Sequence, residues 1–188
     1  MTTEQATALA GEFRAAADEA RRLAQEFSPR ELSQPPAAGA WSAADNLMHL
    51  AVASQLLVPR MTRTLGKLAE AGKRTEKPSR PDWLGRLYAW WLEPPVRIKV
   101  RAPKPFAPPV GLAAEEALRT FLSEQERVLA LVDQSAGLDL AARKVPSPVS
   151  PHIRYNVYSA FRIVLAHERR HLWQARRAAG AVRQAGGN

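Results

Sequence analysis

Cysteine is absent from this chain of 188 residues. Its absence excludes a disulfide-stapled scaffold, a cysteine-ligated zinc or iron–sulfur centre, and a cysteine nucleophile. Long apolar runs are also lacking, since no stretch approaches the roughly 18 consecutive apolar residues that identify a membrane-spanning helix. The segment MTTEQATALAGEF carries acidic residues and no apolar core, so we expect no signal peptide. These absences predict a soluble, cytoplasmic protein with no membrane partner.

Acidic residues are few relative to bases, since 18 Asp and Glu face 27 Lys and Arg and give a formal net charge of +9. A nucleic-acid-binding protein gathers such charge on one face, but here the bases are spread from Arg14 to Arg183. We interpret them mainly as solvated helix surface, and we do not expect a nucleic-acid partner. The densest cluster lies near the C-terminus and consists of Arg162, Arg169, Arg170, Arg176, Arg177 and Arg183.

The pattern of apolar residues predicts helices and no strand. A hydrophobic content of 46% and the chain length suit one domain over residues 1–188. Apolar residues recur every three to four positions in four long stretches, and a short aromatic stretch follows a capping signature. We therefore predict an all-α four-helix bundle with a short extra aromatic helix. The predicted helices cover residues 3–27, 42–71 (kinked or split at Pro59), 83–92, 112–134 and 150–182, the last capped by Ser150 with Pro151 in its first turn.

Proline is concentrated in residues 93–111, which hold six of them. Such a density forbids regular helix and disfavours a central strand, so we expect an extended loop. A long loop of this kind is often a lid or a wall of a binding site. A mobile surface excursion is the equally favoured alternative. Residues 183–188 are expected to form a flexible tail.

Three of the four histidines fall on predicted inward-facing stripes. His167 and His171 lie one turn apart on the last helix, which places their β-carbons about 5–6 Å from each other. His49 lies near the start of the second predicted helix, so the three rings meet if the two helices pack antiparallel. Neutral imidazoles are good ligands for divalent metals, with zinc or nickel the favoured ions here, and three of them leave a position open for water or substrate. His152 is expected to be a cap or surface residue.

Three polar residues beside the histidines are candidates for supporting roles. Asp45 lies one turn before His49 and would orient its ring, unless it caps the helix with Ser42 instead. Gln174 continues the inward stripe and would bind a ligand or pair across the core. Glu168 is a weaker candidate for a general base, because it lies about a hundred degrees around the helix from His167.

Two short motifs resemble those of a known family. WSAADNLMHL over residues 41–50 is similar to the start of the second helix in the DinB/YfiT-like superfamily, and HERRHLWQ over residues 167–174 is similar to the HExxHxxQ helix of that superfamily. The resemblance implies a four-helix bundle with up-down-down-up connectivity and a divalent metal held by His49, His167 and His171. It also implies a homodimer. Relatives with known activity include bacillithiol transferases and a mycothiol-dependent maleylpyruvate isomerase, and others are described only as hydrolases.

Two classes of function follow from these observations. The first is a metal-dependent enzyme of hydrolase or thiol S-transferase type, in which the three-histidine site activates water or an external low-molecular-weight thiol. Any thiol has to come from outside, because the chain has none. The second is a non-catalytic module that binds a small molecule or a protein, with the metal structural or absent. In that case Trp83, Trp90 and Trp91 would line the contact.

Overall fold

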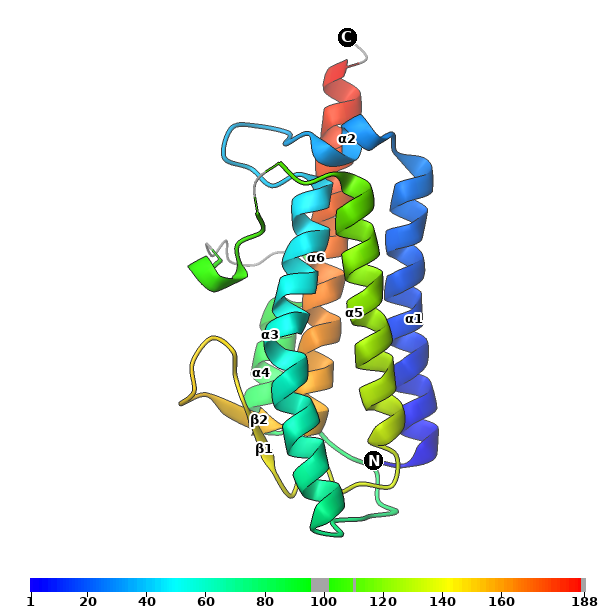
Figure 1. The fold of residues 1–188 in the computed structure, drawn as a ribbon, viewed down its shortest axis with the longest axis vertical. Coiled ribbons are helices and arrows are strands. Elements are labelled where there is room, and N and C mark those ends of the chain that lie inside the picture. The colour runs from blue at the N-terminus through cyan, green and yellow to red at the C-terminus, as the bar shows by residue number, and fades with distance from the viewer. Residues whose placement is uncertain (96–101, 110, 187–188) are drawn as a thin grey trace.

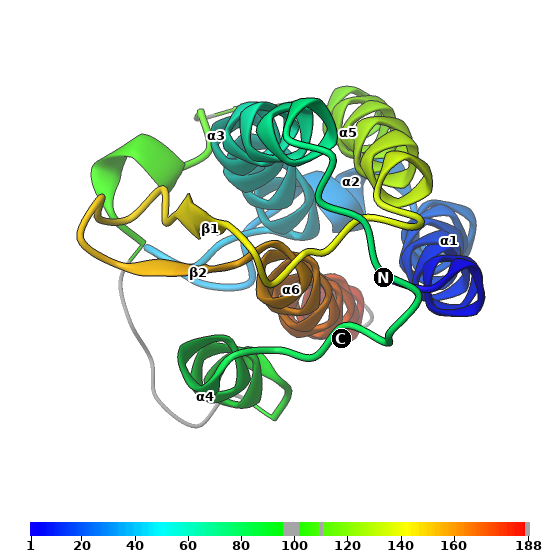
Figure 2. The same cartoon turned by 90° about the horizontal axis from the view of Figure 1, so that it is seen from below.

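Four long helices lie side by side in the computed structural model, which describes residues 1–95, 102–109 and 111–186 (Figure 1). In Figure 1 the first and last of them run upward, and the other two run downward. The view from below in Figure 2 shows the four helices grouped around a common core. The prediction of a mostly helical chain is confirmed. The long helices are α1 (Thr3–Glu26), α3 (Ala43–Glu70), α5 (Ala114–Gln134) and α6 (Val157–Gly186).

Helix α3 begins at the predicted capping box. Ser42 Oγ accepts a hydrogen bond from the Asp45 amide at 3.0 Å, and the Asp45 carboxylate accepts one from the Ser42 amide at 2.9 Å. The helix then passes through Pro59 without interruption, so the predicted possibility of a split is wrong. Proline disfavours a helix interior by about 3 kcal/mol, but the neighbouring side chains of Val58 and Met61 are buried in the core and hold the backbone helical.

A short helix, α2 (Pro29–Ser33), stands where the sequence patterns indicate only an interruption. Ser28 and Glu31 form a second capping box, in which the Ser28 amide donates to the Glu31 carboxylate at 2.7 Å. Leu32 buries its side chain in the core. A helix of one turn is too short to show an apolar period, so only its cap could have revealed it.

Two short strands, β1 (Lys144–Pro146) and β2 (Arg154–Asn156), pair antiparallel with Val145 opposite Tyr155. The prediction that no strand is present is therefore wrong in this detail. Val145 and Tyr155 are 0% and 2% exposed, so burial of this one pair anchors the hairpin. Strands of three residues are too short for alternation to be recognised in the sequence.

Helix α6 starts later and ends later than predicted. It begins at Val157 rather than near Ser150 because the preceding residues are engaged in β2, and the Asn156 side chain caps it by accepting from the Ser159 amide at 2.7 Å. His152, which precedes β2, is exposed, and this agrees with the prediction that it is a surface residue. The helix continues to Gly186, so residues 183–186 are helical rather than a flexible tail. Residues 187–188 lie outside the described part of the chain.

The short helix α4 (Trp83–Leu92) has the predicted bounds and packs against α6. The Asp82 side chain caps it by accepting from the Gly85 amide at 2.8 Å, and it also accepts from the Asn156 amide at 2.8 Å. Gly85 allows this docking, because a β-carbon there would lie 2.1 Å from Ser159 Oγ and 2.2 Å from Ser159 Cβ. The close approach of the two helices therefore requires glycine at this position.

We expect Gly85→Ala to destabilise the protein by about 2 kcal/mol, because the added methyl group forces α4 away from Ser159. Thermal unfolding followed by circular dichroism should show a melting temperature lower by about 5 °C. Gly11→Ala is the matched control, since a β-carbon at Gly11 meets no atom within 4 Å and alanine favours the helix. Equal melting temperatures for the Gly85 variant and the wild type would contradict the proposed contact.

The core is divided by a polar layer half-way along the bundle. On α6 one apolar cluster ends at Leu165 and the next begins at Leu172, and on α5 the corresponding gap lies between Phe121 and Val128. Buried polar residues fill the gap on the two helices, namely Glu124, Gln125, Glu168, Arg170 and His171. Buried polar groups require specific partners, so this layer is where a functional site can be built.

The proline-rich segment is only partly described, because residues 96–101 and 110 lie outside the described residues. The described part is not wholly extended, since Lys104–Phe106 form a turn of 3-10 helix, η1. Phe106 is 7% exposed and lies beside α3. This segment therefore forms a wall next to the polar layer. Within the described residues, no helix has the length and apolar character needed to cross a membrane.

Candidate metal centre

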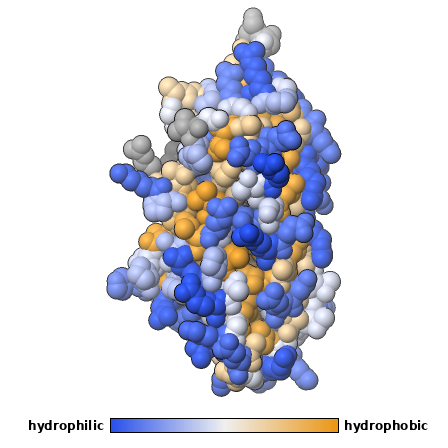
Figure 3. Space-filling model, viewed as in Figure 1, coloured by the Kyte–Doolittle hydropathy of each residue, from blue (hydrophilic) through white to orange (hydrophobic). Residues whose placement is uncertain are grey.

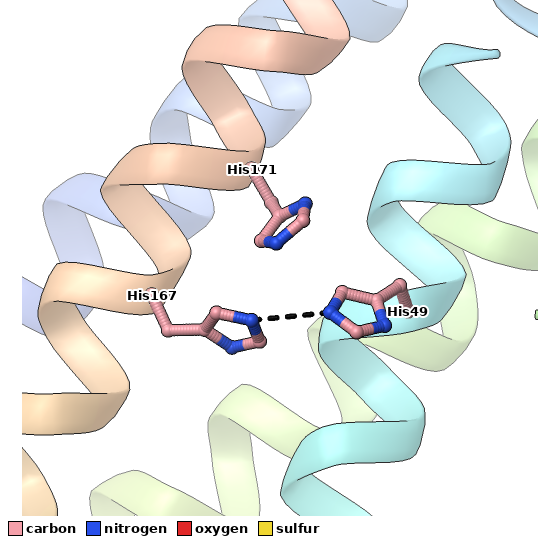
Figure 4. A group of neighbouring side chains, drawn as sticks. All are labelled: His49, His167 and His171. Atoms are coloured by element: carbon pink, nitrogen blue, oxygen red, sulfur yellow. Dashed lines mark hydrogen bonds between the residues drawn. The ribbon is translucent and has the colours of Figure 1, made fainter. Parts of the chain in front are cut away.

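The three predicted histidines come together between α3 and α6 (Figure 4). Their ring centroids are 4.4 Å apart for His49 and His171, 4.6 Å for His167 and His171, and 4.9 Å for His49 and His167. One ring nitrogen from each lies within 4.8 Å of the other two, a spacing compatible with a single metal ion. In Figure 4 all three rings point into the space between the two helices.

Two of the rings are held by hydrogen bonds through Nδ1. His49 Nδ1 lies 2.7 Å from the Phe106 carbonyl oxygen, and His171 Nδ1 lies 2.8 Å from the Asn46 side-chain oxygen. A carbonyl oxygen only accepts hydrogen bonds, so each Nδ1 carries the proton and donates it. The Nε2 atoms of His49 and His171 are then unprotonated, and their lone pairs are available to a metal.

The Nε2 atoms of His49 and His167 face each other at 3.1 Å, the contact drawn as a dashed line in Figure 4. Because His49 Nε2 has no proton, a hydrogen bond between the two requires His167 to donate from Nε2. A metal ion would replace that proton and accept both lone pairs. The two facing nitrogens can therefore share either one proton or one metal cation.

Burial keeps the three imidazoles neutral. Desolvation lowers the pKa of His167 to about 3, and it also lowers the pKa of His49 and His171. Trp41 covers the site, with its ring centroid 4.8 Å from that of His49 and 5.9 Å from that of His171. Neutral imidazole is the form that binds metal, and His167 would only have to carry its proton on Nδ1 instead of Nε2.

A comparison with protein families agrees with this geometry. The model of the DinB superfamily matches residues 12–175, which include all three histidines. The chain belongs to the DinB superfamily. The resemblance predicted from residues 41–50 and 167–174 is thereby confirmed. Among curated proteins and among solved structures, none matches the chain.

Of the two roles predicted for Asp45, this DinB protein has the helix cap, because the His49 ring is held by the Phe106 carbonyl oxygen instead. The Asp45 carboxylate is engaged by the Ser42 amide and hydroxyl at the helix cap. A second ring, that of His171 on α6, is oriented by the neighbouring residue Asn46, which is 3% exposed. Its amide nitrogen donates to the Ser42 carbonyl oxygen at 2.8 Å and so fixes the side chain. Helical spacing from His49 does not reveal this role, because the contact joins two different helices.

Glu168 lines the same cleft as the histidines and pairs with a different helix. Its carboxyl is 1% exposed, and Oε1 accepts a hydrogen bond from Gln125 Nε2 on α5 at 2.6 Å. Burial raises the pKa of Glu168 to about 8, so the carboxyl is largely protonated at neutral pH. The hydrogen bond to Gln125 ties α6 to α5 and directs the carboxyl away from the three rings.

The histidines of the DinB site lie on the wall of a cleft of about 1160 Å³. Of the three tryptophans considered for a binding surface, Trp91 lines this cleft, whereas Trp83 and Trp90 are outside its lining and are 67% and 58% exposed. Cationic groups lie over two of the lining rings, Arg170 at 5.7 Å from the Trp91 centroid and Arg177 at 4.8 Å from that of Trp173. Gln174 lines the same cleft.

The metal-free protein should lose stability as the pH falls below about 6.5. Because the pKa of folded His167 is about 3 against an ordinary 6.5, the unfolded chain binds more protons between these values. The free energy of unfolding then decreases by up to about 1.4 kcal/mol per pH unit for this residue. Urea unfolding of chelator-treated protein at several pH values measures how steeply the free energy of unfolding falls with pH. The His167→Gln variant should show a shallower dependence on pH. Identical slopes would show that His167 is not held neutral by burial.

Proposed function

We propose that this protein is a metal-dependent enzyme whose divalent metal, zinc or nickel, is held by His49, His167 and His171. The observation that carries the proposal is the convergence of three neutral imidazoles, two of them oriented through Nδ1 by acceptors on the protein. The directions of the four long helices support assignment to the up-down-down-up bundle of the family.

The donor set fits a small divalent ion. Zinc–imidazole bonds of about 2.0–2.1 Å place two neighbouring ligand nitrogens roughly 3.0–3.4 Å apart, depending on coordination geometry. The separation of 3.1 Å between the Nε2 atoms of His49 and His167 lies in this range. Three nitrogen ligands and no protein carboxylate in the cluster suit zinc or nickel better than magnesium or calcium, which prefer oxygen.

When bound, such an ion supplies a Lewis acid that lowers the pKa of a water molecule or an external thiol. The chain itself supplies the surroundings. Trp41 and Phe106 shield the ligand rings from solvent, and the cleft beside them holds the substrate. The volume of about 1160 Å³ exceeds the upper range of ordinary small-molecule sites and favours a reaction between two small molecules. We therefore favour thiol transfer over hydrolysis.

In the favoured reaction the external thiol loses its S–H proton to solvent, and its sulfur forms a bond to an electrophilic carbon of the acceptor. The leaving group departs from that carbon with the bonding electrons. Arg170 and Arg177 line the cleft and offer positive charge to a thiol or acceptor that carries carboxylates. The cleft would hold both reactants beside the three histidines.

Reconstitution with zinc or nickel tests the proposal. N-acetylcysteine and monochlorobimane report thiol transfer as a gain of fluorescence, and p-nitrophenyl acetate reports hydrolysis. We expect the metal-loaded protein to accelerate the first reaction, and we expect a chelator or His49→Ala to remove the effect. His152→Ala is the matched control and should leave it unchanged. A protein that binds metal and accelerates neither reaction would fit the non-catalytic binding module instead.

A further inference from the structure

The excess positive charge of the chain is not located where the arginines are densest. Along α6, four arginines of the C-terminal cluster form ion pairs with acidic residues that lie mostly on α1 and α2. The charge of that surface is therefore largely compensated within the protein. The pairs are Arg162 with Glu12, Arg169 with Glu12 and Glu93, Arg176 with Glu19 and Glu26, and Arg183 with Glu31.

Uncompensated bases gather instead in a second concavity, between the C-terminal half of α3 and the β1–β2 hairpin. We call it the basic groove, and its volume is about 710 Å³. Figure 3 shows hydrophilic side chains gathered over the hairpin and the part of α3 beside it. Six of the residues lining the groove are bases, namely Arg60, Arg63 and Lys67 from α3, with Arg143, Lys144 and Arg154 from the hairpin region.

The secondary structure places these six bases around the same groove. Arg60, Arg63 and Lys67 are spaced three and four residues apart, so they share one face of α3. On the hairpin, Val145 and Tyr155 form an opposed pair directed into the core. Alternation along the strands therefore turns Lys144 and Arg154 toward the other face, where the groove lies. Two walls from distant parts of the sequence thus contribute to one cationic surface.

No carboxylate balances this charge. The lining residues include no Asp or Glu, and all acidic residues of the sequence are within the described part of the chain. Among the described residues, none of the six bases makes an ion pair. Like charges held close together repel one another, and an anion that enters the groove relieves this repulsion.

We propose that the basic groove binds a small polyanion that carries two or more phosphate groups. The volume lies within the usual range of small-molecule sites, roughly 300–1,000 Å³. Arginine and lysine side chains from two walls can contact separate phosphates of one ligand at the same time. The lining includes no aromatic side chain, so the groove lacks the stacking surface with which proteins hold single-stranded nucleic acids.

The basic groove is separate from the metal centre. The two concavities share no lining residue, although the hairpin borders both, since Ser147 and Tyr155 line the cleft while Lys144 and Arg154 line the groove. The hairpin therefore stands between them. A ligand in the groove would contact the strand pair whose opposite face carries Tyr155, which lines the cleft.

Isothermal titration calorimetry with tripolyphosphate at low ionic strength tests the proposal. We expect saturable binding that weakens as salt is added. Arg63→Gln/Arg154→Gln removes one exposed base from each wall and should weaken binding about tenfold or more. Arg14→Gln/Arg119→Gln is the matched control, because it removes two exposed bases outside the groove and should leave the affinity unchanged. Circular dichroism checks that both variants fold.

Three results would overturn the proposal. They are the absence of binding at low salt, an equal loss of affinity in the control variant, and tighter groove-dependent binding of a DNA duplex than of tripolyphosphate. Because tripolyphosphate also chelates metals, His171→Ala is titrated as well. If that variant binds tripolyphosphate as the wild type does, the heat of binding comes from the groove. If it no longer binds, the heat comes from the metal centre and the proposal is overturned. This arm also separates the groove from any failure of the proposed enzyme activity.

Discussion

Replacing His171 with alanine should reduce the bound metal from about one ion per chain to less than about a tenth of an ion. Two remaining imidazoles hold a divalent ion far more weakly than three, because each lost ligand returns a coordination position to water. His171 is 8% exposed, and within the described part of the chain the cluster holds no fourth His, Cys, Asp or Glu that could take its place. Plasma mass spectrometry of protein purified in the presence of zinc or nickel measures the ratio.

His152→Ala is the control for this experiment, because it removes an exposed histidine that lies outside the cluster. It should keep the metal content of the wild type. Circular dichroism must show that the His171 variant is still helical, so that loss of metal is not loss of fold. If the folded variant keeps a full equivalent of metal, the three-histidine assignment is wrong.

Asn46→Leu should weaken metal binding about 10- to 100-fold while all three histidines remain. The Asn46 side-chain oxygen accepts the Nδ1 proton of His171 at 2.8 Å, which fixes the tautomer and directs Nε2 into the site. Leucine is similar in size and accepts no hydrogen bond, so the His171 ring loses its orientation. Competition with a fluorescent zinc chelator gives the dissociation constant.

Asn46→Asp separates an orienting role from a packing role. Aspartate accepts the same hydrogen bond and makes the His171 ring more basic, so affinity should be retained or increased. Asp45→Asn is the control at the adjacent position, since Asp45 is engaged by Ser42 in the helix cap. An equal affinity of Asn46→Leu and the wild type would show that the hydrogen bond to His171 does not contribute to the site.

The positions of the long helices and the inward direction of three histidines could be predicted because both depend on local periodicity. Caps such as Ser42 with Asp45 mark helix starts within four residues, and a stripe of apolar side chains marks the buried face. The errors occur where local signals are short or compete. Pro151 suggested a helix start, but burial of Tyr155 against Val145 holds that segment in a strand.

The arginines illustrate a different limit of sequence reasoning. The spacing along α6 shows a basic face, but it does not show that Glu12, Glu19 and Glu26 on α1 lie opposite it. Those partners are about 150 residues away in the chain. Only the packing of the helices brings these arginines and glutamates together. Within the described part of the chain, bases without an acidic partner line the basic groove instead.

The sequence by itself excluded thiolate ligands from any metal site, because cysteine is absent, and it identified the three histidines that face the core. The tertiary structure alone decided that His49 and His167 face each other at 3.1 Å, and that Phe106 and Asn46 hold two of the rings. The physical reason is that helix phase follows from residues three and four apart, whereas hydrogen bonds between helices depend on how whole elements pack.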